Sequence, residues 1–410
     1  MFDADSVWEL NVSPNIKFGT DAVKELPSLL NHQGVSSVAI ITDQGVADAG
    51  IVDYVGDIIS PAVDYHVYSE VKPEPTLEVF QDTLKFVENV EPDLILGIGG
   101  GSPMDVAKTT SILYEHGGDV LSYAAPPTGG GEPVPGQGLP TICVPTTAGT
   151  GSETSPVSVV SLPDEDIKVG ATSRHQIPDT AIVDPTLMTS LPPGPTASSG
   201  MDALSHALEA YTTKTYDAKA RPENPNDRPS YGGRTSITDQ FARKAMKLIT
   251  DNLQQAVNNG GDLTARRNMA LASLLAGMAF TNAGVTGNHA LAMATGSEFN
   301  VPHGTAVAIY LPSIVRFNAP AQPKRFREVA ELFGKNTEDL GNYKAALKAG
   351  ETIEELADAI NIPNGMSEFG VTESDVSLLA EKAMRLERLM SGNPRSATQE
   401  DLEQLILQSL

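Results

Sequence analysis

A cluster of proline and glycine at residues 191–195, Leu-Pro-Pro-Gly-Pro, separates two parts of this chain that have different apolar patterns. Proline fixes φ and lacks an amide hydrogen, so such a cluster cannot continue a helix or a central strand. Before it, apolar residues come in short β-branched runs, and after it they recur at helical spacing over long stretches. We therefore predict two domains, an α/β domain over residues 1–193 and an all-α domain over residues 194–410.

The first part alternates strand-like and helix-like segments. Buried strands are predicted at residues 38–42, 93–98, 141–144 and 181–184, with a helix at residues 76–90. A doubly wound parallel sheet buries such runs on both faces, and it binds ligands at the carboxyl ends of its strands. Asp43 ends the first predicted strand, so we expect its carboxylate at that edge.

A glycine-rich turn, Gly-Gly-Gly-Ser-Pro-Met-Asp at residues 99–105, follows the second predicted strand. Ser102 is predicted to be the N-cap of the next helix, with Pro103 at its first position and Asp105 at capping-box spacing. Glycine amides and a helix N-terminus together favour binding of a pyrophosphate. The spacing is not Gly-x-Gly-x-x-Gly, and Asp43 precedes the glycines, so a simple tight turn is the alternative.

A second polar loop, Pro-Thr-Thr-Ala-Gly-Thr-Gly-Ser-Glu at residues 145–153, follows the third predicted strand. Its hydroxyl groups are suited to ribose and phosphate oxygens, and a plain polar turn is the alternative. Lys168 is predicted to end a charged turn before the strand at residues 181–184.

In the second part, Asp202 and His206 lie one helical turn apart within residues 200–211. Both side chains then leave the same face of a helix, and a carboxylate with a neutral imidazole suits a divalent metal. His289 and His303 are the other histidines of this half and would complete a four-ligand site. A salt-bridged or capped helix face is the more ordinary explanation of the Asp202 and His206 pair.

Composition limits the remaining function classes. The single cysteine, Cys143, excludes an internal disulfide and a thiolate-rich metal site. The 52 acidic against 28 basic residues give a net charge of −24, which argues against nucleic-acid binding and would suit solubility at high salt. Neither a membrane-spanning apolar run nor a signal-peptide pattern is present, so we expect a cytoplasmic protein without a membrane partner.

Four motifs, in this order, resemble those of the iron-dependent (group III) alcohol dehydrogenase family: residues 99–105, residues 145–153, residues 200–206 and the pair His289 and His303. The likeness extends over nearly the whole chain. It implies a dehydroquinate synthase-like architecture, with a doubly wound nucleotide-binding α/β domain, a helical domain and an active site in the cleft between them. It also implies a homo-oligomer, which is common in the family.

The resemblance further implies roles for single residues. The metal ligands, through which catalysis would proceed, are Asp202, His206, His289 and His303, with Fe²⁺ as the usual ion and Zn²⁺ in some relatives. The cofactor-binding set is Asp43, Gly100, Gly101, Ser102, Asp105, Thr146, Thr147 and Lys168. Asp43 would face the adenosine ribose, where a 2′-phosphate would meet a like charge, so NAD is expected in preference to NADP. The metal would act as a Lewis acid on an alcohol or carbonyl oxygen while hydride passes to or from the nicotinamide.

Some features depart from the commonest members of that family. Met293 stands four residues after the third predicted ligand, where many members have a histidine beside the nicotinamide. Residues 211–216, 224–231 and 282–285 look most like the hydroxyacid-oxoacid transhydrogenase branch. That branch implies a substrate carboxylate, as in 4-hydroxybutyrate, with Arg174 and Arg228 as its candidate partners.

The sequence leaves open the role of one insertion and two alternatives for the activity. Residues 218–235 form an aperiodic insertion rich in proline, asparagine and arginine, which suggests either a mobile excursion or a lid. For the activity, the alternatives are a lyase of the dehydroquinate synthase type and a metal and nucleotide binder without turnover.

Overall fold

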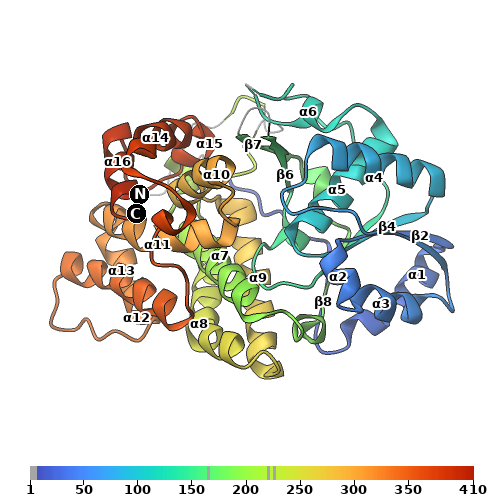
Figure 1. Ribbon diagram of the computed structural model, residues 1–410, viewed down its shortest axis with the longest axis horizontal. Helices are drawn as coiled ribbons and strands as arrows, with labels where there is room; N and C mark the ends of the chain where they lie inside the picture. Colours follow the sequence, from blue (N-terminus) through green and yellow to red (C-terminus); the bar gives the residue numbers. More distant parts are fainter. Residues whose placement is uncertain (1–6, 127, 164–166, 219–221, 225–227) are drawn as a thin grey trace. The chain divides into compact units, whose positions relative to one another are not determined.

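The computed structural model describes residues 7–126, 128–163, 167–218, 222–224 and 228–410 (Figure 1). These residues form two compact units, one of residues Asn11–Leu191 and one of residues Pro192–Leu410 together with residues 7–10. Helix α7 (Pro193–Thr212) begins directly at the proline cluster, with Pro192 as its N-cap. The amides of the first helical turn have no partner inside the helix, so proline is tolerated there. The proline cluster therefore both ends the α/β part of the chain and begins the first helix of the second unit.

The α/β unit contains a six-stranded sheet in the order β1-β8-β5-β4-β2-β3, in which every pair of neighbours is parallel. Its strands are β1 (Asn15–Phe18), β2 (Ser37–Ile41), β3 (Asp64–Tyr68), β4 (Leu94–Gly99), β5 (Thr141–Pro145) and β8 (Thr180–Val183). The four predicted strands are confirmed as β2, β4, β5 and β8. The sequence does not reveal β1 and β3, because these edge strands are largely exposed or half-buried and lack a continuous apolar run.

Helices cover both faces of this sheet, as the side chains of β2 illustrate. Val38 and Ile40 pack into one apolar cluster with α1 and α3, whereas Ala39 and Ile41 pack into a second cluster with α4 and α5. The helices of this unit are α1 (Leu26–Gln33), α2 (Gln44–Asp48), α3 (Ile51–Ile59), α4 (Leu77–Val90), α5 (Gly101–His116) and α6 (Val120–Tyr123). Because both faces of the sheet are buried, consecutive residues of its central strands are apolar.

A separate antiparallel pair, β6 (Val157–Leu162) and β7 (Ile167–Thr172), completes the α/β unit. The prediction of a charged turn ending at Lys168 is wrong, since Lys168 lies within β7. Its side chain is 4% exposed, and its ammonium group pairs with the carboxylate of Glu74. The charged sequence around residue 165 hides a strand because the lysine is buried with a counter-charge, which local patterning does not reveal.

The second unit is built from long helices, with α7 in contact with α8, α9 and α11 (Figure 1). After α7 come α8 (Ser236–Asn258), α9 (Leu263–Ala283), α10 (Gly287–Phe299), α11 (His303–Asn318), α12 (Pro323–Leu332), α13 (Asn342–Ala359), α14 (Val376–Met384), α15 (Glu387–Met390) and α16 (Gln399–Leu407). Among the described residues, no single helix is long and apolar enough to cross a membrane. Helices α9 and α10 pass that test only as a pair, and the pair is bent by 101°.

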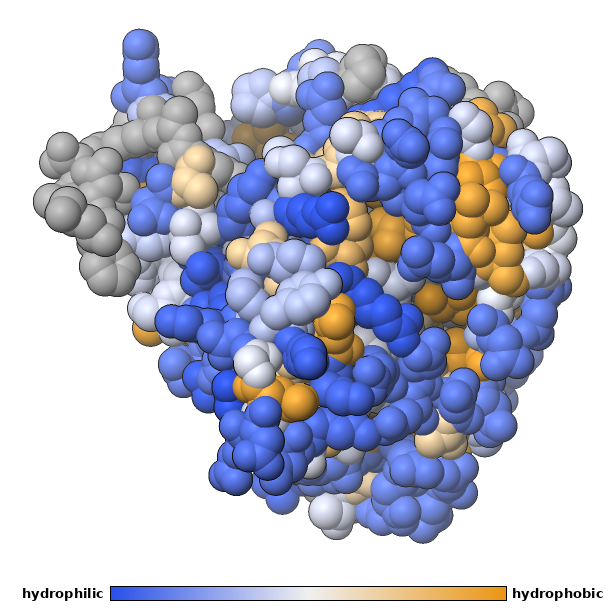
Figure 2. Space-filling model, turned by 90° about the vertical axis from the view of Figure 1, so that its left-hand side faces the viewer, coloured by the Kyte–Doolittle hydropathy of each residue, from blue (hydrophilic) through white to orange (hydrophobic). Residues whose placement is uncertain are grey.

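The face shown in Figure 2 is mainly hydrophilic, with apolar side chains gathered in only part of it. Polar and charged side chains thus make up most of this face.

Candidate functional site

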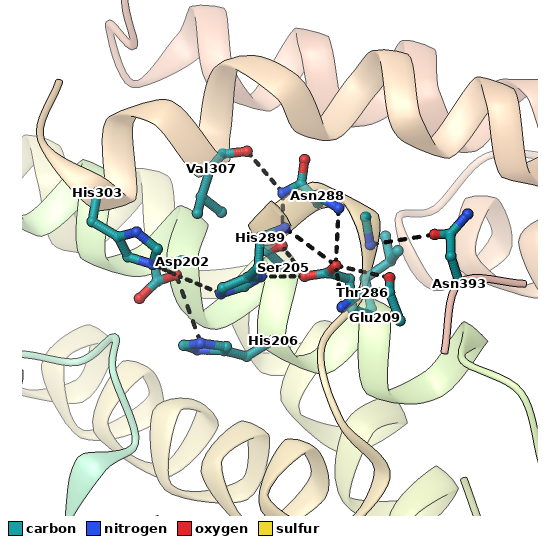
Figure 3. Close-up of polar contacts among 12 residues, drawn as sticks. Asp202, Ser205, His206, Glu209, Thr286, Asn288, His289, His303, Val307 and Asn393 are labelled. Carbon is teal, nitrogen blue, oxygen red and sulfur yellow. Dashed lines mark hydrogen bonds and ion pairs between the residues drawn. The ribbon is translucent and has the colours of Figure 1, made fainter. Parts of the chain in front are cut away.

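Three imidazoles surround one carboxylate in the helical unit (Figure 3). The Nε2 atoms of His206, His289 and His303 lie 3.8, 3.5 and 3.7 Å from Oδ1 of Asp202. Asp202 and His206 come from α7, His289 from α10 and His303 from α11. The structure therefore brings together all four residues that the sequence predicts as metal ligands.

The connection between α10 and α11 places the last two histidines. Asn300 ends α10 in the left-handed conformation, with φ of 53°, and Pro302 is the N-cap of α11. Asparagine tolerates positive φ and proline fixes φ before the next helix, so only three residues join α10 to α11. His289 lies in the first turn of α10, and His303 is the first residue of α11.

Two polar atoms at the centre of this cluster face each other at 3.5 Å. Asp202 Oδ1 and His289 Nε2 make no hydrogen bond to any residue that the structure describes. Leaving such atoms unpaired is costly, and a bound cation would satisfy both. Candidate ligand atoms of Asp202, His206 and His289 lie within 4.8 Å of one another. Asp202 and His206 lie within ion-pairing distance at 3.8 Å, as the salt-bridged helix face requires, but Asp202 also faces His289 and His303 from two other helices.

Neighbouring charges stabilise both the Asp202 carboxylate and a positive charge on the His289 imidazole. Burial by itself would raise the pKa of the Asp202 carboxyl, but the imidazoles of His206, His289 and His303 outweigh it and hold that pKa well below its usual range. Burial would likewise lower the pKa of His289, but the carboxylates of Glu209 and Asp202 raise it to about 10. The carboxylate stays ionised, and a cation is favoured beside it, whether a proton on an imidazole or a metal ion.

Glu209 is a functional candidate that the sequence analysis misses. Its carboxylate is buried and accepts a hydrogen bond from Nδ1 of His289, on the ring edge away from Asp202 (Figure 3). Glu209 follows His206 by three residues, so the two share a face of α7. A carboxylate in helical register with two predicted ligands is the signal that could have identified it.

Phe280 of α9 holds His206 from another side. Its ring stacks on the imidazole, with centroids 4.2 Å apart and planes inclined by 19°. The His289 ring lies next to the same imidazole, at 4.7 Å and 25°. Packing on an aromatic ring limits rotation of His206 and so fixes the direction of its nitrogen atoms.

In the α/β unit, the glycine-rich turn after β4 begins its helix earlier than predicted. Helix α5 starts at Gly101 with Gly100 as N-cap, so the predictions of Ser102 as N-cap, of Pro103 as first residue and of capping-box spacing for Asp105 are wrong. Gly99 has φ of 150°, and a Cβ there would lie 2.7 Å from Pro103 Cγ. The glycines turn the chain into the helix sooner than a residue with a side chain would allow.

The Asp105 carboxylate is used inside the protein. It accepts hydrogen bonds from the hydroxyl of Ser152 and, at 3.0 Å, from the amide of Val159, and it pairs with Lys108 at 2.9 Å. Lys108 is fully buried and also donates to carbonyl oxygens of the segment that follows residue 151. Asp105 thus ties α5 to the second polar loop.

The two predicted cofactor loops meet at the carboxyl ends of β4 and β5. The amide of Thr146 donates to the carbonyl of Gly99 at 2.9 Å. A Cβ on Gly100 would lie 3.7 Å from Thr147 Oγ1, and one on Gly101 would lie 3.0 Å from Thr150 Cγ2. Thr147 Oγ1 is buried and bonds to no residue among those described. This glycine and hydroxyl cradle is suited to phosphate oxygens.

Asp43 lies beside this cradle. Its carboxylate caps α2 by accepting from the Val46 amide at 2.9 Å, and it would lie 3.4 Å from a Cβ on Gly99. Lys168 is on β7 of the same unit.

The two arginines proposed for a substrate carboxylate differ in their surroundings. Arg174 is exposed in a short 3-10 helix of the α/β unit, whereas the guanidinium of Arg228 pairs with Glu9 in the helical unit. Part of the insertion at residues 218–235, and with it part of the stretch 224–231, lies outside the described residues.

Comparison with known proteins gives matches over nearly the whole chain. Residues 13–185 match the iron-containing alcohol dehydrogenase model, and residues 232–410 match the C-terminal model of the Fe-containing alcohol dehydrogenase family. The chain is 33% identical to the human mitochondrial hydroxyacid-oxoacid transhydrogenase, covering 99% of this chain and 90% of that protein. It is 34% identical to the NAD-dependent methanol dehydrogenase of Bacillus methanolicus, covering 97% and 99%. A crystal structure of 1,3-propanediol oxidoreductase superposes with a TM-score of 0.90 at 33% identity, covering 98% and 100% of the two chains.

Proposed function

Since this chain belongs to the iron-containing alcohol dehydrogenase family and is an oxidoreductase of that family, we propose that it transfers hydride between a small alcohol or hydroxyacid and NAD with the help of a divalent metal. Membership of the family favours this reaction over the lyase alternative. The homo-oligomeric state expected from the family stays a prediction.

One observation carries the metal assignment: Asp202 Oδ1 and His289 Nε2 are buried without a hydrogen bond to any described residue, within reach of two more imidazoles. One carboxylate and three imidazoles suit Fe²⁺ and Zn²⁺ alike, and the family favours Fe²⁺. When bound, the ion supplies Lewis acidity toward a substrate oxygen, and NAD supplies the hydride chemistry. Asp202 offsets the cationic charge, and His303, whose side chain is 37% exposed, lies on the accessible side of the site.

The α/β unit supports NAD as the cofactor. The cradle of Gly100, Gly101 and Thr147 would accept the pyrophosphate, because backbone and hydroxyl donors can approach it without a side chain in between. Asp43 beside this cradle would repel the 2′-phosphate of NADP. Ser102, Asp105, Thr146 and Lys168 remain proposed members of the cofactor site, and the internal bonds of Asp105 suggest that it shapes the loop.

Within this reaction class we favour substrates that carry a carboxylate. Met293 and the transhydrogenase-like stretches support that branch, as does the similarity to the human hydroxyacid-oxoacid transhydrogenase. Arg228 already has a carboxylate partner in Glu9, so Arg174 is the better candidate to receive a substrate carboxylate. The proposed donor is 4-hydroxybutyrate and the proposed acceptor is 2-oxoglutarate.

Product analysis tests this assignment. Fe²⁺-loaded protein is mixed with 4-hydroxybutyrate and 2-oxoglutarate without added NAD, and succinic semialdehyde and 2-hydroxyglutarate are measured. Multiple turnovers support a transhydrogenase that retains its cofactor. Strict dependence on added NAD, with faster oxidation of 1,3-propanediol than of 4-hydroxybutyrate, would return the chain to the alcohol dehydrogenases that act on uncharged substrates.

A further inference from the structure

We propose that Glu209 is a positioning residue for the metal centre: it fixes the tautomer of His289, so that Nε2 presents a lone pair toward Asp202, and it holds the start of α10 against α7. This inference rests on the metal site of the proposed function. It concerns a residue that is not itself among the four proposed ligands.

The two oxygen atoms of Glu209 have different partners (Figure 3). Oε1 accepts from the amide and hydroxyl of Thr286, at 2.7 and 2.8 Å, and from the amide of Asn288 at 3.2 Å. Oε2 accepts from Nδ1 of His289 and from the hydroxyl of Ser205, the latter at 2.9 Å. One oxygen therefore binds the beginning of α10, and the other binds the imidazole.

The chemistry of these partners sets the direction of the His289 contact. A carboxylate only accepts hydrogen bonds, so Nδ1 of His289 must donate. In the neutral imidazole the proton then resides on Nδ1, and Nε2 carries the free lone pair. That Nε2 atom is 3.5 Å from Asp202 Oδ1, where the ion is expected.

Glu209 also replaces a missing cap. Thr286 is the N-cap of α10, but its side chain makes no capping bond within that helix. The Glu209 carboxylate satisfies first-turn amides from outside, where the helix dipole favours negative charge. Asn288 extends the network by donating to Ser205 Oγ at 2.9 Å and to the Val307 carbonyl of α11 at 3.0 Å. The start of α10 is thus fixed to α7 and α11.

Glu209→Gln separates the two roles because it keeps the shape of the side chain. The single amide oxygen can serve only one set of partners, and four donors at the start of α10 compete with the His289 ring and the Ser205 hydroxyl. We expect the oxygen to stay with α10. The amide nitrogen then faces His289 Nδ1, which must accept, and the proton moves to Nε2, where it opposes a metal ion.

The test is equilibrium dialysis of Co²⁺ against the metal-free full chain. Glu209→Gln is expected to weaken Co²⁺ binding by about 10- to 100-fold, as is typical of lost partners of metal-bound histidine. Thr286→Val is the matched control: it removes one hydroxyl donor to Glu209 but leaves the His289 contact, so affinity should stay within about threefold. Thermal unfolding of each metal-free variant is measured alongside, because a purely structural role would lower stability without changing the affinity of the folded protein.

The outcomes distinguish this inference from the proposed metal site. Loss of Co²⁺ binding in His289→Ala with unchanged affinity in folded Glu209→Gln overturns the role of Glu209 alone. Equal binding by the wild type and His289→Ala, or no binding by the wild type, overturns both.

If Glu209→Gln does not fold, proton NMR of the Co²⁺-loaded wild type decides. A shifted, slowly exchanging imidazole N–H signal, assigned to Nδ1 of His289 by ¹⁵N labelling of histidine, is expected for a proton that Glu209 protects. Its absence would overturn the inference.

Discussion

The two units offer their proposed ligands different kinds of atoms. In the helical unit the proposed metal site is made of side-chain atoms, among them Asp202 Oδ1 and His289 Nε2, which have no hydrogen bond to the described residues. In the α/β unit the cradle is mostly backbone, exposed because Gly100 and Gly101 lack Cβ atoms. A site made of side chains is lost when one of those side chains is truncated. A backbone site tolerates truncation of nearby side chains, but a side chain introduced at one of its glycines blocks it. The two sites should therefore respond to mutation separately.

The largest effect is expected for His206→Ala, which should impair the metal site without affecting the proposed NAD site. His206→Ala should lower turnover by at least about 1000-fold, because Lewis-acid catalysis contributes several kcal/mol and tenfold in rate corresponds to about 1.4 kcal/mol. NAD affinity should change by less than about twofold, since the glycine cradle belongs to the other unit. Steady-state kinetics, metal content and calorimetric NAD titration check this. Near-normal turnover together with normal metal content would remove His206 from the site.

A second prediction concerns a buried carboxyl group of the α/β unit, that of Glu153. Glu153 is 2% exposed, and its Oε2 makes no bond to the described residues, so burial raises its pKa from 4.5 to about 7 although Lys108 is near. Between pH 4.5 and 7 the Glu153 carboxyl is protonated in the folded state but ionised in the unfolded state. The contribution of this group to the free energy of unfolding is therefore complete below pH 4.5, and on the order of 3 kcal/mol of it is lost as the pH rises to 7.

Glu153→Gln should remove this loss. The free energy of unfolding of both proteins is measured in urea between pH 4.5 and 8. The free energy of the variant relative to the wild type should rise up to about pH 7 and stay constant above it. A constant difference across the range would mean that Glu153 is ionised in the folded protein.

The smallest effect concerns the one side chain proposed to select the cofactor. Asp43→Ser removes a negative charge but keeps an oxygen that can cap α2, as serine is a good N-cap. The ratio of NADP to NAD use should rise by about tenfold, since one charge contact near the surface is worth roughly 1 to 4 kcal/mol. Competition kinetics with both cofactors measure it. Asp43→Asn, which is uncharged and also caps, should give a similar shift, and an unchanged ratio in both would place the 2′ position elsewhere.

The features predicted correctly from the sequence are those that depend on the spacing of residues close to one another in the chain. The central strands were visible because burial on both faces demands apolar runs, and Asp202 with His206 was visible because helical spacing puts them on one face. Ser102 as N-cap was wrong because the glycines before it can turn the chain earlier than residue statistics suggest. Strand β7 was missed because Lys168 is buried against Glu74, a partner 94 residues away. The position of Glu209 on the ligand face of α7 was visible in the sequence, but its role was not, because its partners on α10 come from a helix about 80 residues later.

The path of the chain has a consequence for biosynthesis. Residues 7–10 belong to the helical unit, where Glu9 pairs with Arg228, but the chain then builds the whole α/β unit before returning at Pro192. The α/β unit is one continuous stretch and can fold once Leu191 has left the ribosome. The early segment must wait for the helices that receive it, roughly ten to forty seconds at ordinary rates of synthesis. During that interval Glu9 lacks its partner Arg228, so this ion pair can form only after the whole α/β unit has been synthesised.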